Sequence, residues 1–157
     1  MADNYTRLAD TISSSEGKAF ITINGQNREL FELQSIRAQL DMIVQERRIL
    51  GHRMTQHKVV GATGSGSTTM YFMNSQHLNE ALKYIKTGSR TPIKVQLRNE
   101  DTQSTVGKQE VVLGNIIFST VPVAAIEESD DPITFDTDFT FDDLENLESF
   151  VLPENYR

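Results

Sequence analysis

Hydrophobic and polar residues alternate along several stretches of the chain, which is the pattern of half-buried β-strands. The clearest case is 133–142, where every even-numbered position is polar and the odd-numbered ones are apolar except Thr137. The Asn24-Gly25 pair suits a two-residue hairpin turn, because both turn positions need a positive φ. Further strands are expected at about 18–23, 28–46, 91–98, 108–119 and 120–127.

One of these runs, 28–46, fits two periods. Leu33, Ile36 and Leu40 recur at helical spacing, whereas a two-residue alternation accounts for the run with a single exception at Ile43. We therefore favour an extended strand. The glycine-rich segment that follows, with glycines at 61, 64 and 66, is interpreted as a turn into another strand.

A single amphipathic helix is predicted over 75–87. Asn74 or Ser75 can cap its first turn, and Gly88 can end it in the left-handed conformation. His77 falls in the first turn and is expected to be exposed. The apolar stripe of this helix consists of Leu78, Ala81, Leu82 and Ile85.

Many strands and one helix predict a mainly β fold, an antiparallel barrel or sandwich with one flanking α-helix. The 157 residues favour one domain. Residues 1–16 are serine-rich and read as a flexible arm, and 144–157 as a C-terminal tail with one short turn. No apolar run approaches the ~20 residues needed to cross a bilayer, and the first 17 residues do not resemble a signal peptide, so no membrane anchor is expected.

The charge of the chain is unevenly placed. The net charge is -7, yet residues 127–157 hold half of the acidic side chains and only one basic one. Residues 47–58 are basic and contain no acid, and they are interpreted as an exposed loop or a splayed hairpin arm. If the two segments meet between neighbouring copies, the contact is heterologous and generates rings or filaments. Pairing within one chain is an equal alternative.

Phosphate-binding and thiol chemistry are not supported. The segment 61–68 resembles a phosphate-binding loop, but Ser67 stands where the loop needs lysine, and a strand-like run follows instead of a helix. The chain contains no cysteine, which excludes disulfides, thiolate metal sites and cysteine nucleophiles.

Metal and acid–base sites are not supported either. His52 and His57 lie among cations, which repel a metal ion. Asp136 and Asp138 lie on a predicted strand and lack the calcium-loop pattern. We therefore expect no enzyme, no metal and no cofactor.

Several segments resemble one family. They are the run from Ile49 to Lys58, the glycines at 61, 64 and 66, the strand Met70-Tyr71-Phe72, the helix end from Tyr84 to Ser89, and the ending from Phe139 to Asp142. Together they resemble the tail tube proteins of PBSX-like prophages and contractile-tailed phages, over about residues 16–143. The departures are His52 and Gln56, where arginine and glycine are usual.

This resemblance implies a structural subunit that forms stacked hexameric rings around the lumen of an inner tail tube. It implies two packed antiparallel sheets with a helix on the flank, and pairing between neighbours through the long strands 28–46 and 108–127. The implied localisation is a virion tail, or a phage-tail-like particle, assembled in the bacterial cytoplasm. The implied partners are a sheath protein, a tape-measure protein and baseplate or terminator proteins, without specific nucleic-acid binding. Whether the tube conducts DNA or belongs to a DNA-free particle stays open at this point.

Two groups of residues carry the expected contacts. A long inter-subunit loop at 45–60 would reach a neighbouring subunit or the next ring through Arg47, Arg48, Gly51, His52, Arg53, Met54, His57 and Lys58. An acidic row of Asp136, Asp138 and Asp142 would face either the lumen or the sheath. The alternative function is a small β-barrel that binds nucleic acid through 47–58, although this segment has no aromatic residues to stack on bases.

Overall fold

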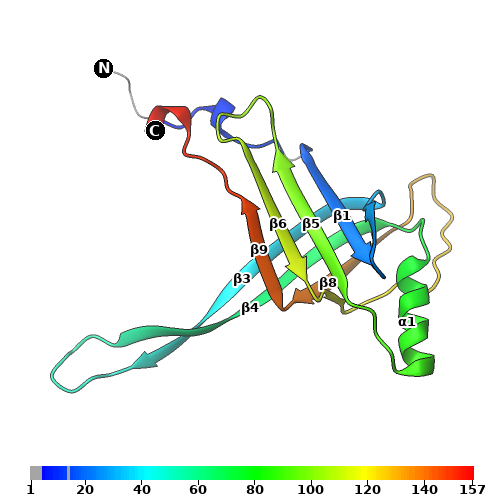
Figure 1. Cartoon of the computed structure of the whole chain (residues 1–157), viewed down its shortest axis with the longest axis horizontal. Coiled ribbons are helices and arrows are strands. Elements are labelled where there is room, and N and C mark those ends of the chain that lie inside the picture. The colour runs from blue at the N-terminus through cyan, green and yellow to red at the C-terminus, as the bar shows by residue number, and fades with distance from the viewer. Residues whose placement is uncertain (1–4, 14) are drawn as a thin grey trace.

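A computed structural model describes residues 5–13 and 15–157. It consists of two antiparallel sheets and one α-helix, with a long hairpin projecting from the body (Figure 1). The strands are β1 (Gly17–Ile23), β2 (Gln26–Glu29), β3 (Leu33–Arg47), β4 (Gln56–Tyr71), β5 (Ile93–Glu100), β6 (Lys108–Gly114), β7 (Ile117–Phe118), β8 (Thr134–Phe141) and β9 (Asp143–Glu148). The helices are α1 (Gln76–Thr87) and the 3-10 turns η1 (Leu8–Asp10) and η2 (Glu154–Tyr156).

The sheets have the strand orders β2-β1-β5-β6-β9 and β3-β4-β8-β7. Alternating side chains of β1, β5 and β8 are buried, as the two-residue period predicted. The core lies between the sheets and includes Ile21, Val95 and Leu113 from the first and Met70 and Phe139 from the second. The mainly β prediction with two antiparallel sheets and one flanking helix is confirmed.

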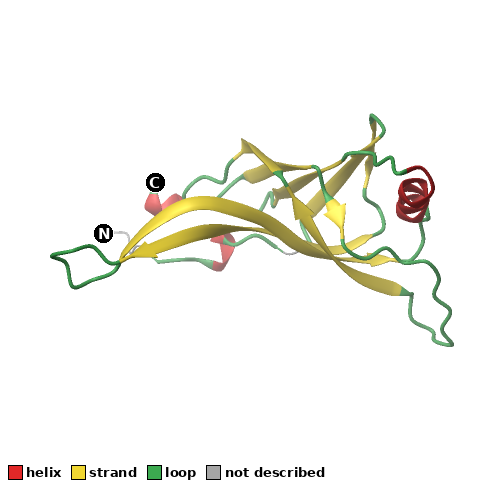
Figure 2. Cartoon of the chain, turned by 90° about the horizontal axis from the view of Figure 1, so that it is seen from below, coloured by secondary structure: helices red, strands yellow, loops and turns green. Residues whose placement is uncertain are grey.

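The hairpin between β3 and β4 extends well beyond the body, and we call it the arm (Figures 1 and 2). Its strands pair from Leu33↔Met70 out to Arg47↔Gln56, with a register shift between Ile43 and Val44. The predicted loop 45–60 is therefore shorter than expected, because only 48–55 lies outside the two strands.

The glycine-rich segment is not a turn, contrary to the sequence interpretation. Gly64 and Gly66 lie inside β4, opposite Phe141 and Phe139 of β8. A Cβ at Gly66 would lie 2.4 Å from the Cζ atom of Phe139. These glycines thus make room for aromatic rings on the neighbouring strand.

The predicted strands after the helix are only partly correct. Residues 108–119 divide into β6 and β7, and 120–127 form no strand. The predicted strand 108–119 is divided because the chain changes sheets within it. β6 lies between β5 and β9 in one sheet, and β7 pairs with β8 in the other. The predicted pairing of neighbours through 108–127 is therefore wrong for β6.

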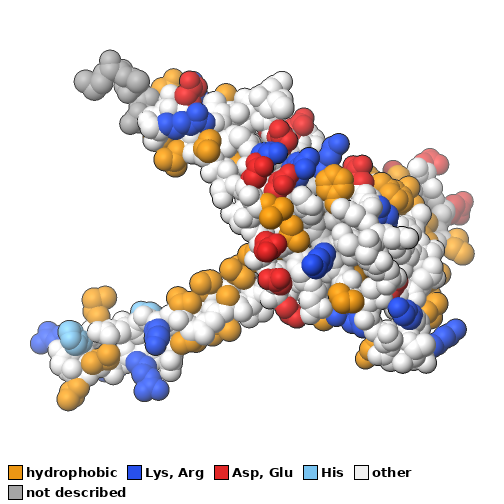
Figure 3. Space-filling view, viewed as in Figure 1, with side chains coloured by type: hydrophobic (Ala, Val, Ile, Leu, Met, Phe, Trp, Pro, Cys, Tyr) orange, Lys and Arg blue, Asp and Glu red, His pale blue; other side chains and the backbone are white. Residues whose placement is uncertain are grey.

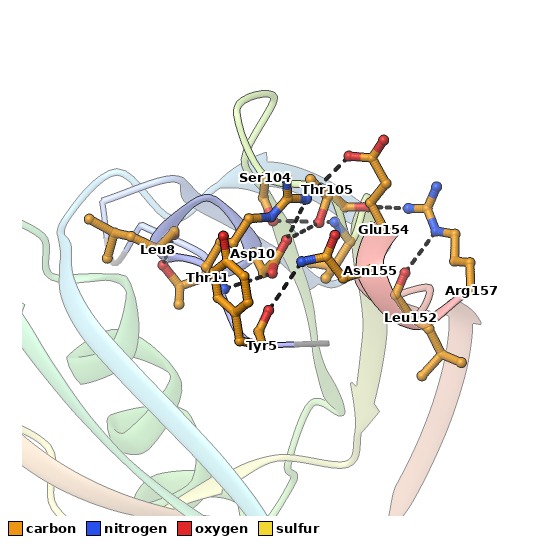
Figure 4. Close-up of polar contacts among 12 residues, drawn as sticks. Tyr5, Leu8, Asp10, Thr11, Ser104, Thr105, Leu152, Glu154, Asn155 and Arg157 are labelled. Atoms are coloured by element: carbon orange, nitrogen blue, oxygen red, sulfur yellow. Dashed lines mark hydrogen bonds and ion pairs between the residues drawn. The ribbon is translucent and has the colours of Figure 1, made fainter. Parts of the chain in front are cut away.

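The described segments next to the two termini contact each other and the turn between β5 and β6 (Figure 4). The segment 144–157 is not a fraying tail, because β9 pairs with β6. Of the predicted N-terminal arm 1–16, residues 1–4 and 14 lie outside the described residues. The described part includes η1 with the buried Asp10, whose carboxylate accepts a 2.6 Å hydrogen bond from the Thr105 hydroxyl. Arg7 forms an ion pair of 3.2 Å with Glu154 from η2.

The helix α1 starts and ends as its sequence indicates. The side-chain oxygen of Asn74 accepts a 2.9 Å hydrogen bond from the backbone amide of Gln76, and Gly88 has a φ of 72°. The orientation differs from the prediction, because His77 is 7% exposed while Leu82 and Ile85 of the apolar stripe are exposed. Among the described residues, no helix has the length and apolar character that a membrane span requires.

Candidate assembly surfaces

The end of the arm carries the predicted contact residues, and we call residues 47–58 the basic tip. Arg47 ends β3, Arg48–Met54 lie in the turn, and His57 and Lys58 begin β4. All twelve positions are exposed (Figure 3). The end of the hairpin thus holds all eight predicted contact residues, and their role in contacts between subunits stays a prediction.

The cations of the basic tip are not neutralised by the rest of the chain. In the described part, 5–13 and 15–157, the ion pair found at the tip joins His57 Nε2 to Glu46 Oε1 at 3.4 Å, and Arg47, Arg48, Arg53 and Lys58 form none. Gly51 has a φ of 90°, which allows the tight turn. Pairing of the basic and acidic segments within one chain is thus not seen in the described residues.

Apolar side chains accompany these cations. Leu50 is 100% exposed, and Ile49 and Met54 are exposed beside it. Further along the arm, both faces are apolar and exposed, through Met42 and Val44 on β3 and Val59 and Val60 on β4, among others. A two-stranded ribbon with apolar side chains on both faces is a surface that requires a covering partner.

The base of the arm also leaves core surface uncovered. A hollow of about 920 Å³ opens there between the two sheets. Leu33, Ile36, Leu97 and Val111 line it, together with polar residues. The core of a single subunit is therefore incomplete at this point.

The acidic row is only partly assembled by the fold. Asp136 and Asp138 point outward from β8, and the Asp136 carboxylate accepts a 2.6 Å hydrogen bond from the Thr69 hydroxyl on β4. Asp142 lies beyond the end of β8, where its carboxylate accepts a hydrogen bond from Asn115. Two of the three predicted side chains thus share one face.

The outer face of the sheet β3-β4-β8-β7 is polar. Next to Asp136 and Asp138 it presents the small hydroxyl side chains of β4 and the polar side chains of β3, in the register Arg37↔Ser67 and Gln39↔Ser65. These residues are partly or fully exposed. This face therefore combines hydroxyl, amide and carboxylate groups with the guanidinium of Arg37.

The same sheet is open at both edges. Within the described residues, β3 pairs with β4 on one side only, and it is 15 residues long. At the opposite edge β7 is two residues long and covers β8 only at Phe139 and Thr140. Open edges of this kind bind further strands through their free amide and carbonyl groups.

A buried polar cluster connects α1 to the body, and the sequence analysis missed it. Glu32 is 1% exposed and forms an ion pair with Arg28, whose Nη1 lies 3.1 Å from Glu32 Oε2. Arg28 also donates from Nε to Gln76 Oε1 at 2.9 Å. His77 Nε2 lies 3.5 Å from Glu32 Oε1, and its ring meets the Phe118 ring edge-on at 5.2 Å between centroids.

The neighbours of Glu32 keep its carboxylate ionised. Burial would raise the pKa of Glu32, but His77 and Arg28 outweigh burial and lower the pKa to about 2. The carboxylate is therefore charged throughout the physiological range. No spacing in the sequence shows this cluster, because Glu32 and His77 come from different elements that meet only in the fold.

The described residues contain no group of three or more histidine, aspartate or glutamate side chains placed to bind a metal ion. What the fold does bring together is a projecting basic and apolar tip, an open-edged sheet and a polar sheet face. Features of this kind are typical of subunits that assemble with other protein chains.

Comparison with known proteins points the same way. The family model described as "DUF2001: Phage tail tube protein" matches residues 4–148. The chain is 29% identical over 139 residues to the phage-like element PBSX protein XkdM of Bacillus subtilis, covering 88% of this chain and 92% of that protein. It is equally similar, with the same identity and coverage, to the uncharacterized protein YqbM of the same organism.

Solved structures share the fold. One chain in the cryo-EM structure of the anti-feeding prophage baseplate has a TM-score of 0.68 and 12% identity, covering 87% of this chain and 95% of that chain. One in the structure of the anti-feeding prophage cap has a TM-score of 0.65 and 10% identity, covering 95% of each chain. The nucleic-acid-binding alternative gains no support from these matches. The chain therefore belongs to the phage tail tube protein family, and it is a structural subunit of the tail of a phage or phage-like particle rather than an enzyme.

Proposed function

We propose that the chain acts as one tube domain, six copies of which close into a ring, and that these rings stack into the inner tube of a contractile tail. The observation that carries the proposal is the sheet β3-β4-β8-β7, which is open at both edges within the described residues. An open edge is an aggregation hazard for a free protein, and a ring removes it by pairing each edge with the next copy.

The two edges are different, which favours a closed ring. One edge is the long strand β3, and the other is the exposed part of β8 beside the short β7. Pairing β3 of one copy with β8 of the next is a heterologous contact, because two different surfaces meet. Such contacts repeat in one direction and close into a ring where the rotation between copies adds up to a full circle.

The polar outer face of the same sheet suits the lumen. In a closed ring all copies turn this face to the same side, so Asp136 and Asp138 would repeat around the inside of the tube. On this face the carboxylates of Asp136, Asp138 and Asp41 outnumber the guanidinium of Arg37, so the lining would repel nucleic-acid phosphates and DNA could pass without binding. We therefore assign the acidic row to the lumen rather than to the sheath.

The remaining partners follow from the architecture of such a tail. A sheath protein would surround the tube, a tape-measure protein would occupy the lumen during assembly, and baseplate and terminator proteins would bind the two ends. The basic tip, with Arg47, Arg48, Gly51, His52, Arg53, Met54, His57 and Lys58, would hold successive copies together along the tube.

The proposal is tested by electron microscopy of the purified protein in negative stain. Rings or tubes are expected at high concentration, whereas a persistent monomer would contradict the proposal. Changing Arg53→Glu and Lys58→Glu should block stacking while leaving the circular dichroism spectrum unchanged. The matched control changes Lys18→Glu and Lys94→Glu, two exposed lysines on the body, and should still form tubes.

The nucleic-acid alternative is tested with the same proteins. Fluorescence anisotropy with labelled oligonucleotides should show no binding by the subunit at physiological salt. Salt-dependent binding that disappears in the Arg53→Glu, Lys58→Glu variant would favour the alternative function.

A further inference from the structure

The two ends of the sheet β3-β4-β8-β7 have opposite chemistry. The basic tip lies beyond the Arg47↔Gln56 end of the hairpin. The other end of β4, at Tyr71, pairs with Thr134, the first residue of β8. The long connection 119–133, which we call the acidic loop, leads into Thr134 and therefore lies at the end far from the tip (Figure 2).

The acidic loop mirrors the tip in charge. It carries Glu127, Glu128, Asp130 and Asp131 and contains no lysine or arginine. All four carboxylates are exposed, and in the described part of the chain none of them forms an ion pair. The subunit thus has unneutralised positive charge at one end of the sheet and unneutralised negative charge at the other.

The acidic loop also matches the tip in its apolar side chains. Ile126 is 97% exposed and Val123 is exposed next to it. On the tip, Leu50 is equally exposed between cations. Fully exposed large aliphatic side chains on both complementary ends indicate that each is covered in a complex.

A groove adjoins the acidic loop and could receive such a side chain. It has a volume of about 430 Å³ and lies between α1 and β7, with walls that include Ala81, Ile93, Phe118 and Val121. Val121 belongs to both the groove and the acidic loop. His77 also lines the groove; its Nε2 faces Glu32 Oε1 at 3.5 Å, and its Nδ1 has no hydrogen-bond partner among the described residues.

Three cations lie near this groove and must be weighed against the acids. Arg90 is engaged by its own chain, donating to Asn115 Oδ1 at 2.8 Å and to the carbonyl of Ile116 at 2.6 Å. Lys83 donates to the Thr91 hydroxyl at 3.1 Å. Lys86 is exposed on the last turn of α1. Glu80 also lines the groove. Together with the four carboxylates of the acidic loop it outnumbers the three cations, so this end of the subunit carries net negative charge.

We propose that the acidic loop and the adjoining groove receive the basic tip of a second copy of this chain. Leu50 of one copy would enter the apolar groove of the next, while Arg48 and Arg53 would face Glu127 and Glu128. Because the two surfaces lie at opposite ends of one sheet, the contact repeats from head to tail and builds a stack instead of a closed dimer. This inference rests on the proposed tube and names the surface that holds its rings together.

The most direct test is disulfide cross-linking, because the chain has no cysteine of its own. A Leu50→Cys copy and a Val121→Cys copy, mixed under conditions that form tubes and then oxidised, should give a covalent dimer on a non-reducing gel, because Val121 lines the groove that Leu50 would enter. The matched control pairs Leu50→Cys with Leu152→Cys, an exposed leucine in the segment before η2, and should give no dimer above background. A dimer with Val121→Cys no stronger than the dimer with Leu152→Cys would overturn the proposal.

A charge exchange tests the electrostatic part. Glu127→Lys with Glu128→Lys should prevent stacking, and adding Arg48→Glu and Arg53→Glu to the same chain should restore it. The matched control, Glu16→Lys with Glu100→Lys, changes two exposed acids, one directly before β1 and one at the end of β5, and should stack normally.

The outcomes separate the inference from the proposed function. If the unmodified protein forms no rings or tubes, the proposed function fails. If it forms tubes and the Glu127→Lys, Glu128→Lys variant forms them equally well, or the combined variant stays defective, the tip binds elsewhere and only this inference fails.

Discussion

Replacing Gly66 by alanine should destabilise the subunit strongly, because the space for a side chain is already filled. A Cβ built at Gly66 would lie 2.3 Å from the carbonyl oxygen of Arg37 and 2.4 Å from the Cζ atom of Phe139. The Arg37 oxygen belongs to β3, the strand paired with β4 at this point. Relief of the clash therefore requires movement of a strand and of a buried ring.

The magnitude follows from two opposing effects. Overpacking a well-packed core costs about 1–3 kcal/mol, and a backbone oxygen that cannot rotate away places this site at the upper end. Alanine regains about 0.5–1 kcal/mol over glycine through the lower entropy of the unfolded chain. The net loss should be about 2 kcal/mol, which lowers Tm by about 4–8 °C in a chain of this length.

Thermal unfolding followed by circular dichroism measures the effect, at a concentration where the protein stays monomeric, because assembly adds concentration-dependent stability. Gly61→Ala is the matched control in the same strand, since its Cβ would meet only Ile43 Cδ1, at an ordinary 3.5 Å. This control should change Tm little. Equal Tm values for both variants would refute the argument that β8 rings fill the space above the β4 glycines.

Three further outcomes are expected from the polar groups. The free energy of unfolding of the unmodified subunit should fall as pH drops from about 4.5 towards 2. The folded state lowers the pKa of Glu32, so the charged carboxylate stabilises the fold and its protonation removes about 3 kcal/mol in total. The Glu32→Gln variant, which leaves Arg28 without its charged partner, should be less stable at pH 7 and should lose this pH dependence in urea titrations; a parallel pH profile would contradict the assignment. Asp136→Lys with Asp138→Lys should still form tubes but should retain labelled DNA in a pelleting assay, and tubes that fail to assemble would move these side chains from the lumen to an interface. Asp10→Asn should increase trypsin cleavage of the N-terminal segment, because it weakens the hydrogen bond from the Thr105 hydroxyl that attaches this segment and chiefly lowers the pKa of Asp10. An unchanged digestion pattern would show that this bond does not hold the segment.

The parts of the fold that depend on local pattern were predictable. The alternation at 133–142 identified β8, because its side chains point in turn to the core and to the outside. Asn24-Gly25 marked the first hairpin, and both residues have positive φ, 55° and 75°. The basic tip was recognisable because a run of cations with no acid to pair with has no place in a core.

The parts that depend on distant contacts were not predictable. The β4 glycines were misread because their role lies in the rings of β8, which are remote in sequence. His77 was expected outside, but Glu32 and Phe118 cover it from two other elements. In the sequence pattern Asp142 continues the acidic row, but β8 ends at Phe141, so Asp142 lies outside the strand and does not share the face of Asp136 and Asp138.

The arm has no interior of its own, since its apolar side chains are exposed on both faces beyond the body. A two-stranded ribbon without a covering layer is only marginally stable in water. In a free subunit its amide hydrogens should therefore exchange with solvent quickly, and they should become protected once a neighbour lies against it. Ordering of the ribbon is then coupled to growth of the polymer, so that polymerisation starts slowly and a finished particle dissociates with difficulty.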